Sequence, residues 1–121
     1  MTRVRDCSAQ VIDGRQKKAE AFLDSAEVDA DMSPDVRVTL LIHAGIAASD
    51  VLCCRSLGHY VQGESHNEAI KELEKVNRKL ARDLGLLLGM KTRAGYGHSP
   101  VSGADAKRAA RAATRLVEAT R

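Results

Sequence analysis

An almost uninterrupted apolar run from Val36 to Leu52 constrains the fold more than any other part of this chain. Its apolar side chains fall on nearly every face of a helix, which is typical of the central, most buried helix of a bundle. The stretch from Val38 to Leu52, with His43 and Asp50 inside it, is expected to be too short and too polar to span a bilayer. The apolar residues are Val36, Val38, Leu40, Leu41, Ile42, Ala44, Ile46, Ala47, Ala48, Val51 and Leu52.

Start and stop signals bound this central helix. Ser33 precedes Pro34, which is the arrangement of a serine N-cap with proline at the first helical position. Gly58 is placed to cap the other end. Gly45 costs about 1 kcal/mol of helix propensity, but it permits a neighbouring helix to approach closely. The sequence therefore predicts a helix over residues 34–57.

The composition also favours helices. The chain has 121 residues, enough for one domain that buries a core without disulfides or a structural metal. Its apolar side chains are mainly Ala, Leu, Val and Ile, with one Phe, two Tyr and no Trp. Small side chains let helix backbones approach, whereas sheets draw on more β-branched and aromatic residues. We expect a single all-α domain, residues 1–121, built as an up-and-down bundle of four to five helices.

Three further helices are predicted from caps and apolar spacing. The first covers residues 13–30 and starts at Asp13. The next starts at a capping box in residues 65–68 and bends at Asn77, and the last begins at Ser102. Residues 1–12 are predicted to be a mobile arm or a frayed first turn, and residues 58–64 a connecting loop.

The three cysteines are expected to be reduced thiols. Cys53 and Cys54 are neighbours on one helix and point in different directions, so they cannot easily pair with each other. An odd count, with no signal-like apolar run near the N-terminus, favours a cytoplasmic protein. A Cys–His nucleophile from Cys54 and His43 would have to act across about 16 Å of helix. A zinc site from Cys53, Cys54, His59 and His66 lacks the usual Cys-x2-Cys spacing, so no metal or cofactor is predicted.

The net charge of +3 hides an asymmetry along the chain. Residues 1–90 carry a net charge of −2, and residues 91–121 carry +5. A concentrated basic region suggests a phosphate-bearing partner. The alternative is a solvated face of the last helix, on which Lys107, Arg111 and Arg115 recur every four residues.

The connection before the last helix gathers the residues best suited to chemistry, namely Lys91, Arg93, Tyr96 and His98. Arg93 falls in the final turn of a predicted helix, where the helix dipole favours a cation. The next helix offers free N–H groups near Ser102. A guanidinium binds phosphate bidentately, and an imidazole accepts a proton near neutral pH. His98 would take the ribose 2′-hydroxyl proton while Arg93 offsets the charge growing on the phosphorane, so RNA would be cleaved without a metal.

A helical bundle with Arg93 and His98 at its last helix connection resembles the HEPN family (higher eukaryotes and prokaryotes nucleotide-binding). Catalytic members of that family carry an Arg, a short spacer and a His, as in the segment Arg93-Ala94-Gly95-Tyr96-Gly97-His98. Segments 45–50 and 91–97 are also similar to those of small bacterial members. The resemblance covers nearly the whole chain in helix order and length.

The resemblance implies a metal-independent endoribonuclease with Arg93 and His98 as its catalytic residues. It also implies a homodimer that brings two such corners together over one RNA. Such a protein would act as the toxin of a toxin–antitoxin pair, beside a nucleotidyltransferase-like antitoxin. The sequence departs from the family pattern in two places. Ala94 follows the arginine where active members often have a polar residue, and Pro100 stands where some members have a modified tyrosine.

Lys91, Tyr96 and Asp50 are the predicted substrate-binding residues. A carboxylate in a mostly apolar helix needs a partner, so Asp50 is expected either to pair with Arg93, Lys91 or Tyr96 or to lie at an exposed edge of the helix. Tyr96 has the alternative of a packing aromatic. Two other functions remain open: a non-catalytic HEPN module that binds a nucleotide or a nucleotidyltransferase through Arg93 and Lys91, and a bundle that only oligomerises.

Overall fold

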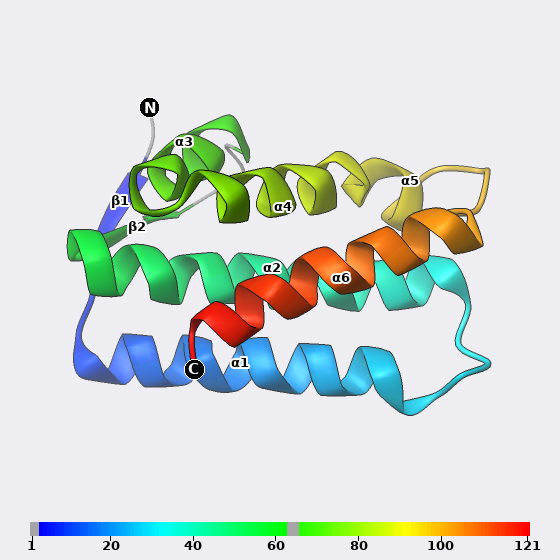
Figure 1. Ribbon diagram of the computed structural model, residues 1–121, viewed down its shortest axis with the longest axis horizontal. Helices are drawn as coiled ribbons and strands as arrows, with labels where there is room; N and C mark the ends of the chain where they lie inside the picture. Colours follow the sequence, from blue (N-terminus) through cyan, green and yellow to red (C-terminus); the bar gives the residue numbers. More distant parts are fainter. Residues whose placement is uncertain (1–2, 63–65) are drawn as a thin grey trace.

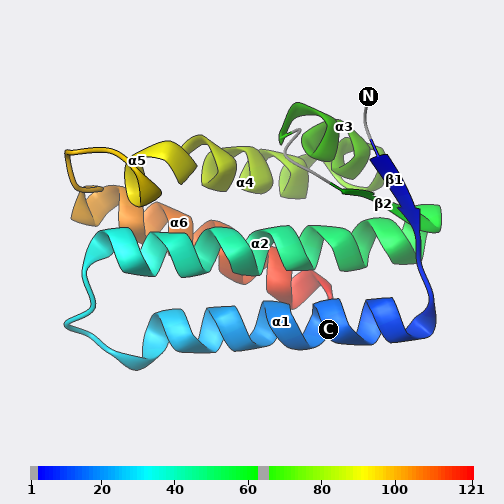
Figure 2. The same ribbon diagram turned by 180° about the vertical axis from the view of Figure 1, so that it is seen from behind.

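The computed structural model describes residues 3–62 and 66–121, which form a bundle of helices (Figure 1). The helices over residues 9–28, 34–57, 78–89 and 103–119 alternate in direction along one axis, and the helix over residues 66–76 lies with a small β-ribbon at one end (Figure 2). The all-α, up-and-down bundle expected from the sequence is confirmed. The elements are β1 (Arg3–Asp6), α1 (Ala9–Val28), α2 (Pro34–Leu57), β2 (His59–Gln62), α3 (His66–Val76), α4 (Arg78–Gly89), the short α5 (Lys91–Gly95) and α6 (Gly103–Ala119).

Helix α2 is the centre of the bundle and packs against all the other helices. Most of its apolar residues between Val38 and Cys54 are buried, whereas Val36 in the first turn is exposed. A Cβ added to Gly45 would lie 2.5 Å from Leu87 Cδ1 of α4 and 3.4 Å from Leu116 Cδ1 of α6. The prediction that Gly45 permits close helix approach is therefore confirmed, because the leucines of two neighbouring helices occupy the space a side chain would need.

By length and composition alone, an 18-residue window of α2 is apolar enough to cross a membrane. The expectation that the apolar run is too short and too polar for a span was therefore wrong on those two criteria. In the bundle, however, 61% of that window is buried inside the protein. The central helix of a helical core has the same apolar character as a membrane span.

The predicted caps hold at both ends of α2 and at the start of α6. Ser33 Oγ accepts the Val36 N–H at 3.3 Å, and Ser102 Oγ accepts the Asp105 N–H at 3.1 Å. Gly58 adopts a left-handed conformation with φ of 78° and donates its N–H to the carbonyl of Cys54 at 3.0 Å. The predicted limits of α2 are confirmed because each cap is a local signal.

The predicted start of α1 was wrong. The helix begins at Ala9 rather than Asp13, and Ser8 is its N-cap, accepting the Val11 N–H at 3.1 Å. Asp13 instead lies within the helix and pairs with Lys17 one turn later, at 3.0 Å. Asn77 is a true helix boundary, since its side chain accepts the Leu80 N–H at 3.0 Å and separates α3 from α4. The predicted capping serine of α3, Ser65, lies outside the described residues.

The predictions of a mobile arm or frayed first turn over residues 1–12 and of a loop over residues 58–64 were wrong over residues 3–6 and 59–62, which form strands, whereas residues 9–12 form the first turn of α1. Strands β1 and β2 pair antiparallel, with Arg3 opposite Gln62 and Asp6 opposite His59. The ribbon lies at the end of the bundle where α2 ends and α1 begins (Figure 2). The two strands are far apart in sequence and carry little alternating apolar pattern, so no local signal marks them.

A disulfide joins Cys7, directly after β1, to Cys54 in the last turn of α2. The expectation of three reduced thiols was wrong, although the reasoning that Cys53 and Cys54 do not pair with each other holds. Cys53 is the free cysteine and is buried. The argument for a cytoplasmic location from reduced thiols therefore loses its basis, because persistent disulfides are rare in that compartment.

We expect Gly45→Val to lower the free energy of unfolding by about 1–3 kcal/mol, because the added side chain overpacks against Leu87 and Leu116. Urea unfolding measures the loss. Gly14→Val is the matched control, since Gly14 lies in α1 with nothing within 4 Å of an added Cβ. Equal stabilities for the two variants would contradict the close packing at Gly45.

Reduction of the disulfide should destabilise the fold by roughly 4 kcal/mol, because the Cys7–Cys54 bond closes a loop with a sequence separation of 47. Urea unfolding with and without a phosphine reductant measures this difference. In the Cys7→Ala/Cys54→Ala double variant the reductant should have no effect. A wild-type transition that is insensitive to reductant would show that the bond does not form in solution.

Candidate functional site

The predicted corner is the connection from α5 to α6, at the end of the bundle opposite the β-ribbon (Figures 1 and 2). The chain turns sharply after Arg93, and the N–H groups of Tyr96 and Gly97 both donate to the carbonyl of Thr92 at 2.9 Å. A Cβ on Gly97 would come within 3.2 Å of the Arg93 Cα and carbonyl oxygen. The turn therefore closes tightly on the backbone of Arg93, where a glycine fits best.

The far side of the turn is fixed to α2. The N–H of Val101 donates to Asp35 Oδ1 at 2.8 Å, and the Val101 side chain is 3% exposed. Ser102 then caps α6. The segment that carries His98 is thus held at both ends, by Thr92 on α5 and by Asp35 on α2.

The side chains of the corner face solvent. Arg93 and His98 are exposed, Lys91 is half-buried, and Tyr96 is 83% exposed. Within residues 3–62 and 66–121, none of these four side chains forms an ion pair or hydrogen bond. The high exposure of Tyr96 contradicts the alternative prediction that its ring packs against the rest of the protein. The structure therefore presents two cations, a phenol and an imidazole on one constrained segment.

The start of α6 is only partly available to an anion. Ser102 Oγ already accepts the Asp105 N–H, and the Asp105 carboxylate lies in the first turn, where it pairs with Arg108 at 3.3 Å. A carboxylate in that position competes with an external anion for the positive end of the helix dipole. Any anion at the corner would depend mainly on Arg93 and Lys91.

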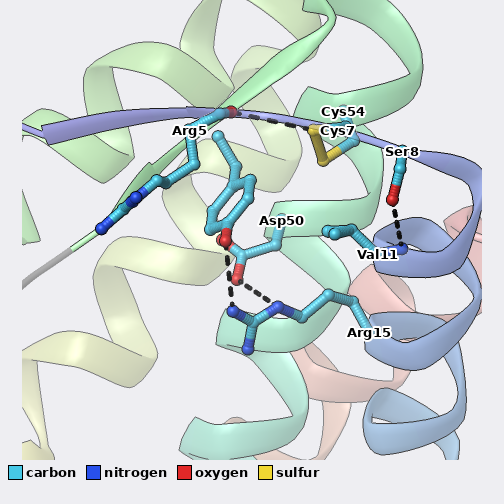
Figure 3. The surroundings of a disulfide bond; sticks show 8 residues. Arg5, Cys7, Ser8, Val11, Arg15, Asp50 and Cys54 are labelled. Carbon is cyan, nitrogen blue, oxygen red and sulfur yellow. Dashed lines mark hydrogen bonds and ion pairs between the residues drawn. A yellow bond between two sulfur atoms is a disulfide. The ribbon is translucent and has the colours of Figure 1, made fainter.

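Asp50 does not belong to this corner, so its predicted pairing with Arg93, Lys91 or Tyr96 is wrong. Its carboxylate lies 3.7 Å from Arg15 Nε, beside the disulfide and β1 (Figure 3). Asp35, which marks the corner on the same helix, lies about 22 Å away along the helix axis. The exposed-edge alternative is also wrong, because the Asp50 side chain is only 13% exposed. The face of α2 on which Asp50 lies could be predicted from the residue spacing along the helix, but the partner of Asp50 on α1 could not.

Burial raises the pKa of the Asp50 carboxyl to about 7, and the charge of Arg15 offsets only part of that rise. Arg15 Nη2 donates to the hydroxyl of Tyr60 at 3.5 Å, and the guanidinium lies over the Tyr60 ring, 5.3 Å from its centroid. This cluster was not predicted from the sequence, since it joins α1, α2 and β2. The only sign of the cluster in the sequence was the carboxylate of Asp50 in an otherwise apolar helix.

The cysteine and histidine sites that sequence reasoning set aside do not form. Cys54 is in the disulfide, and His43 stacks on Phe22 with ring centroids 5.3 Å apart. His59 lies 3.0 Å from a Glu72 oxygen. In the part of the chain that the structure describes, no group of three or more His, Cys, Asp or Glu side chains is arranged to hold a metal.

A groove of about 630 Å³ runs between α4 and α6. Arg115 makes a bidentate pair with Asp83 there, at 2.9 and 2.8 Å, and this hydrogen bonding raises the pKa of Arg115. Arg115 is therefore a structural cation rather than part of a free basic face. The groove is lined by Asn77, Lys79, Leu80, Arg82, Asp83, Arg115, Glu118 and Ala119.

Comparison of the chain with models of known protein families, with curated proteins and with solved structures gave no match. The resemblance to the HEPN family therefore rests on the residues of this sequence alone.

The raised pKa of Asp50 predicts a specific pH dependence of stability. Between about pH 4 and 7 the folded state keeps a proton that the unfolded state has released, so Asp50 destabilises the fold increasingly as the pH rises, up to about pH 7. We therefore expect Asp50→Asn to gain stability relative to wild type on going from about pH 5 to about pH 8, by up to roughly 3 kcal/mol. Urea unfolding across this range tests it, and a difference that is constant with pH would contradict it.

Proposed function

We propose that this chain is a metal-independent endoribonuclease of the HEPN type. The observation that carries the proposal is the state of Arg93 and His98. Both are exposed, Arg93 on the short α5 and His98 on the turn that follows it, and neither has a counter-ion within the described residues. By contrast, Arg108, Arg115 and Arg121 are each paired with a carboxylate.

The chemistry follows from the four side chains of the corner. His98 accepts the proton of a ribose 2′-hydroxyl, which then attacks the adjacent phosphorus and displaces the 5′-oxygen of the next nucleotide. Arg93 binds the phosphate and offsets the charge that develops in the transition state. Lys91 adds a second cation for the backbone, and the exposed ring of Tyr96 offers a surface on which a base can stack.

A homodimer fits this proposal, because a single corner carries one imidazole while cleavage also needs an acid for the leaving oxygen. Two copies that bring their corners together over one RNA would supply both groups. The toxin role and a nucleotidyltransferase-like antitoxin partner are part of the same proposal and derive from the resemblance.

The second candidate is a non-catalytic module that binds a nucleotide or a nucleotidyltransferase through Arg93 and Lys91. The structure offers one observation in its favour: no described side chain hydrogen-bonds to His98, so nothing fixes the tautomer or orientation that a general base requires.

We expect the purified protein to cleave single-stranded RNA in the presence of EDTA, giving 2′,3′-cyclic phosphate ends. His98→Ala should lower the rate about 10²–10⁴-fold, as for loss of a general base. Arg93→Ala should lower it about 10²–10³-fold. Gel analysis of a labelled oligonucleotide measures both.

Arg111→Ala is the matched control, since Arg111 is an exposed arginine of α6 outside the corner. If RNA stays intact with wild type and with His98→Ala alike, the ribonuclease proposal fails. Binding of RNA or nucleotide that weakens with Arg93→Ala but not with His98→Ala would then select the non-catalytic module.

A further inference from the structure

A shallow pocket of about 240 Å³ lies on α1 beside β2. Residues 10, 14 and 18 follow one another at intervals of four, and residues 11 and 15 do the same, so they share one side of the helix. Tyr60 closes the pocket from β2 and is 8% exposed. The lining consists of Gln10, Val11, Gly14, Arg15, Lys18 and Tyr60.

Gly14 lies in the lining of this pocket, in open space. It lies in the interior of α1, where a glycine costs about 1 kcal/mol relative to alanine. The fold does not require it, because its backbone is helical and an added Cβ would meet nothing within 4 Å. Without a side chain at this position, a hollow is left between Gln10 and Lys18. A costly glycine that serves no packing purpose suggests that the open space is used.

The lining of the pocket is positively charged. It contains the cations of Arg15 and Lys18, the amide of Gln10 and no carboxylate. Lys18 has no ion pair among the residues that the structure places. Arg15 has a partner in Asp50, whose Oδ2 lies at the comparatively long distance of 3.7 Å from Arg15 Nε (Figure 3). This carboxylate titrates near neutral pH, so it only partly neutralises the guanidinium.

The guanidinium of Arg15 is held in position for binding. Its Nη2 donates to the Tyr60 hydroxyl at 3.5 Å, and its Cζ lies 5.3 Å from the centroid of the Tyr60 ring. A guanidinium already oriented by an aromatic ring loses little conformational entropy when it binds an anion. Tyr60 and Val11 add an apolar wall beside the two cations.

We propose that this pocket binds the phosphate group of a small phosphomonoester, with Arg15 and Lys18 on the phosphate and Tyr60 and Val11 beside the organic part. Two cations match the two charges of a monoester, and a fork of guanidinium N–H groups matches its oxygens. The pocket lies at the other end of the bundle from the α5–α6 corner, so this inference does not depend on the ribonuclease proposal.

The test is an NMR titration with phenyl phosphate, compared with sodium chloride at the same ionic strength. Wild type should show saturable shifts at the amides of residues 10–18 and 60. Arg15→Gln should weaken binding at least about tenfold, the loss expected for a charge-assisted hydrogen-bonded pair, and Lys18→Gln should weaken it several-fold. Lys17→Gln is the matched control, because Lys17 is exposed on the same helix, is paired with Asp13 and does not line the pocket.

A second variant separates binding from folding. Gly14→Leu should fill the hollow and abolish the shifts, while the thermal midpoint of unfolding rises because a helix-forming residue replaces glycine. Asp50→Asn should tighten phenyl phosphate binding several-fold, since it removes the competitor for Arg15. The NMR shifts of the amides of residues 91–98 report on ligand binding at the corner. Absence of binding at the pocket and absence of binding at the corner are therefore observed separately.

Three results would overturn the proposal: no saturable shift in wild type, unchanged affinity in Arg15→Gln, or unchanged affinity in Gly14→Leu. A short RNA at equal phosphate concentration should compete less well than phenyl phosphate, because each backbone phosphate carries a single charge. Stronger competition by RNA would also contradict a monoester site.

Discussion

The structure depends on close packing around the middle of α2. At Gly45 the leucines of α4 and α6 enter the space that a side chain would otherwise fill, and a Cβ there would lie 2.5 Å from Leu87. This approach is what lets a core poor in aromatic residues reach high density, since small side chains bring the helix backbones together. The same packing places α5 and the start of α6 beside the first half of α2, where Asp35 holds the turn through Val101. The geometry of the corner is thus a consequence of helix packing.

Long-range contacts hold both ends of the chain onto this core. The disulfide and the β-ribbon attach the N-terminal segment to α2. Arg121 makes a bidentate pair with Glu20 at 2.9 and 2.8 Å, and Arg55 donates to the Thr120 carbonyl at 2.5 Å, so the end of the chain is attached to α1 and α2. None of these contacts is local in sequence. The disulfide restrains the unfolded chain, and the other contacts restrain the termini. The apolar faces of the helices determine the bundle itself.

This division explains what the sequence could predict. The limits of α2 and the start of α6 follow from serine and glycine caps, which act within one helical turn. The start of α1 was missed because Asp13 and Ser8 are both acceptable caps, and only the ribbon before Ser8 decides between them. The disulfide could not be predicted because Cys7 meets Cys54 only when β1 has paired with β2. Asp50 could be recognised as unusual, but its partner Arg15 comes from another helix, and no sequence spacing relates the two.

The charges at the candidate sites also depend on contacts between residues that are far apart in the sequence. A net charge of +5 in the last quarter suggested one basic region, yet three of its seven cations are paired with carboxylates. Asp83, Asp105 and Glu20 each take one of its arginines. The cations that stay without a carboxylate in the described residues include Arg93 at the corner and Lys18 on α1. Lys18 lies in the part of the sequence whose net charge is negative. The position of each counter-ion, rather than the sum of charges, therefore decides where an anion can bind, and that position becomes known only when the helices are packed.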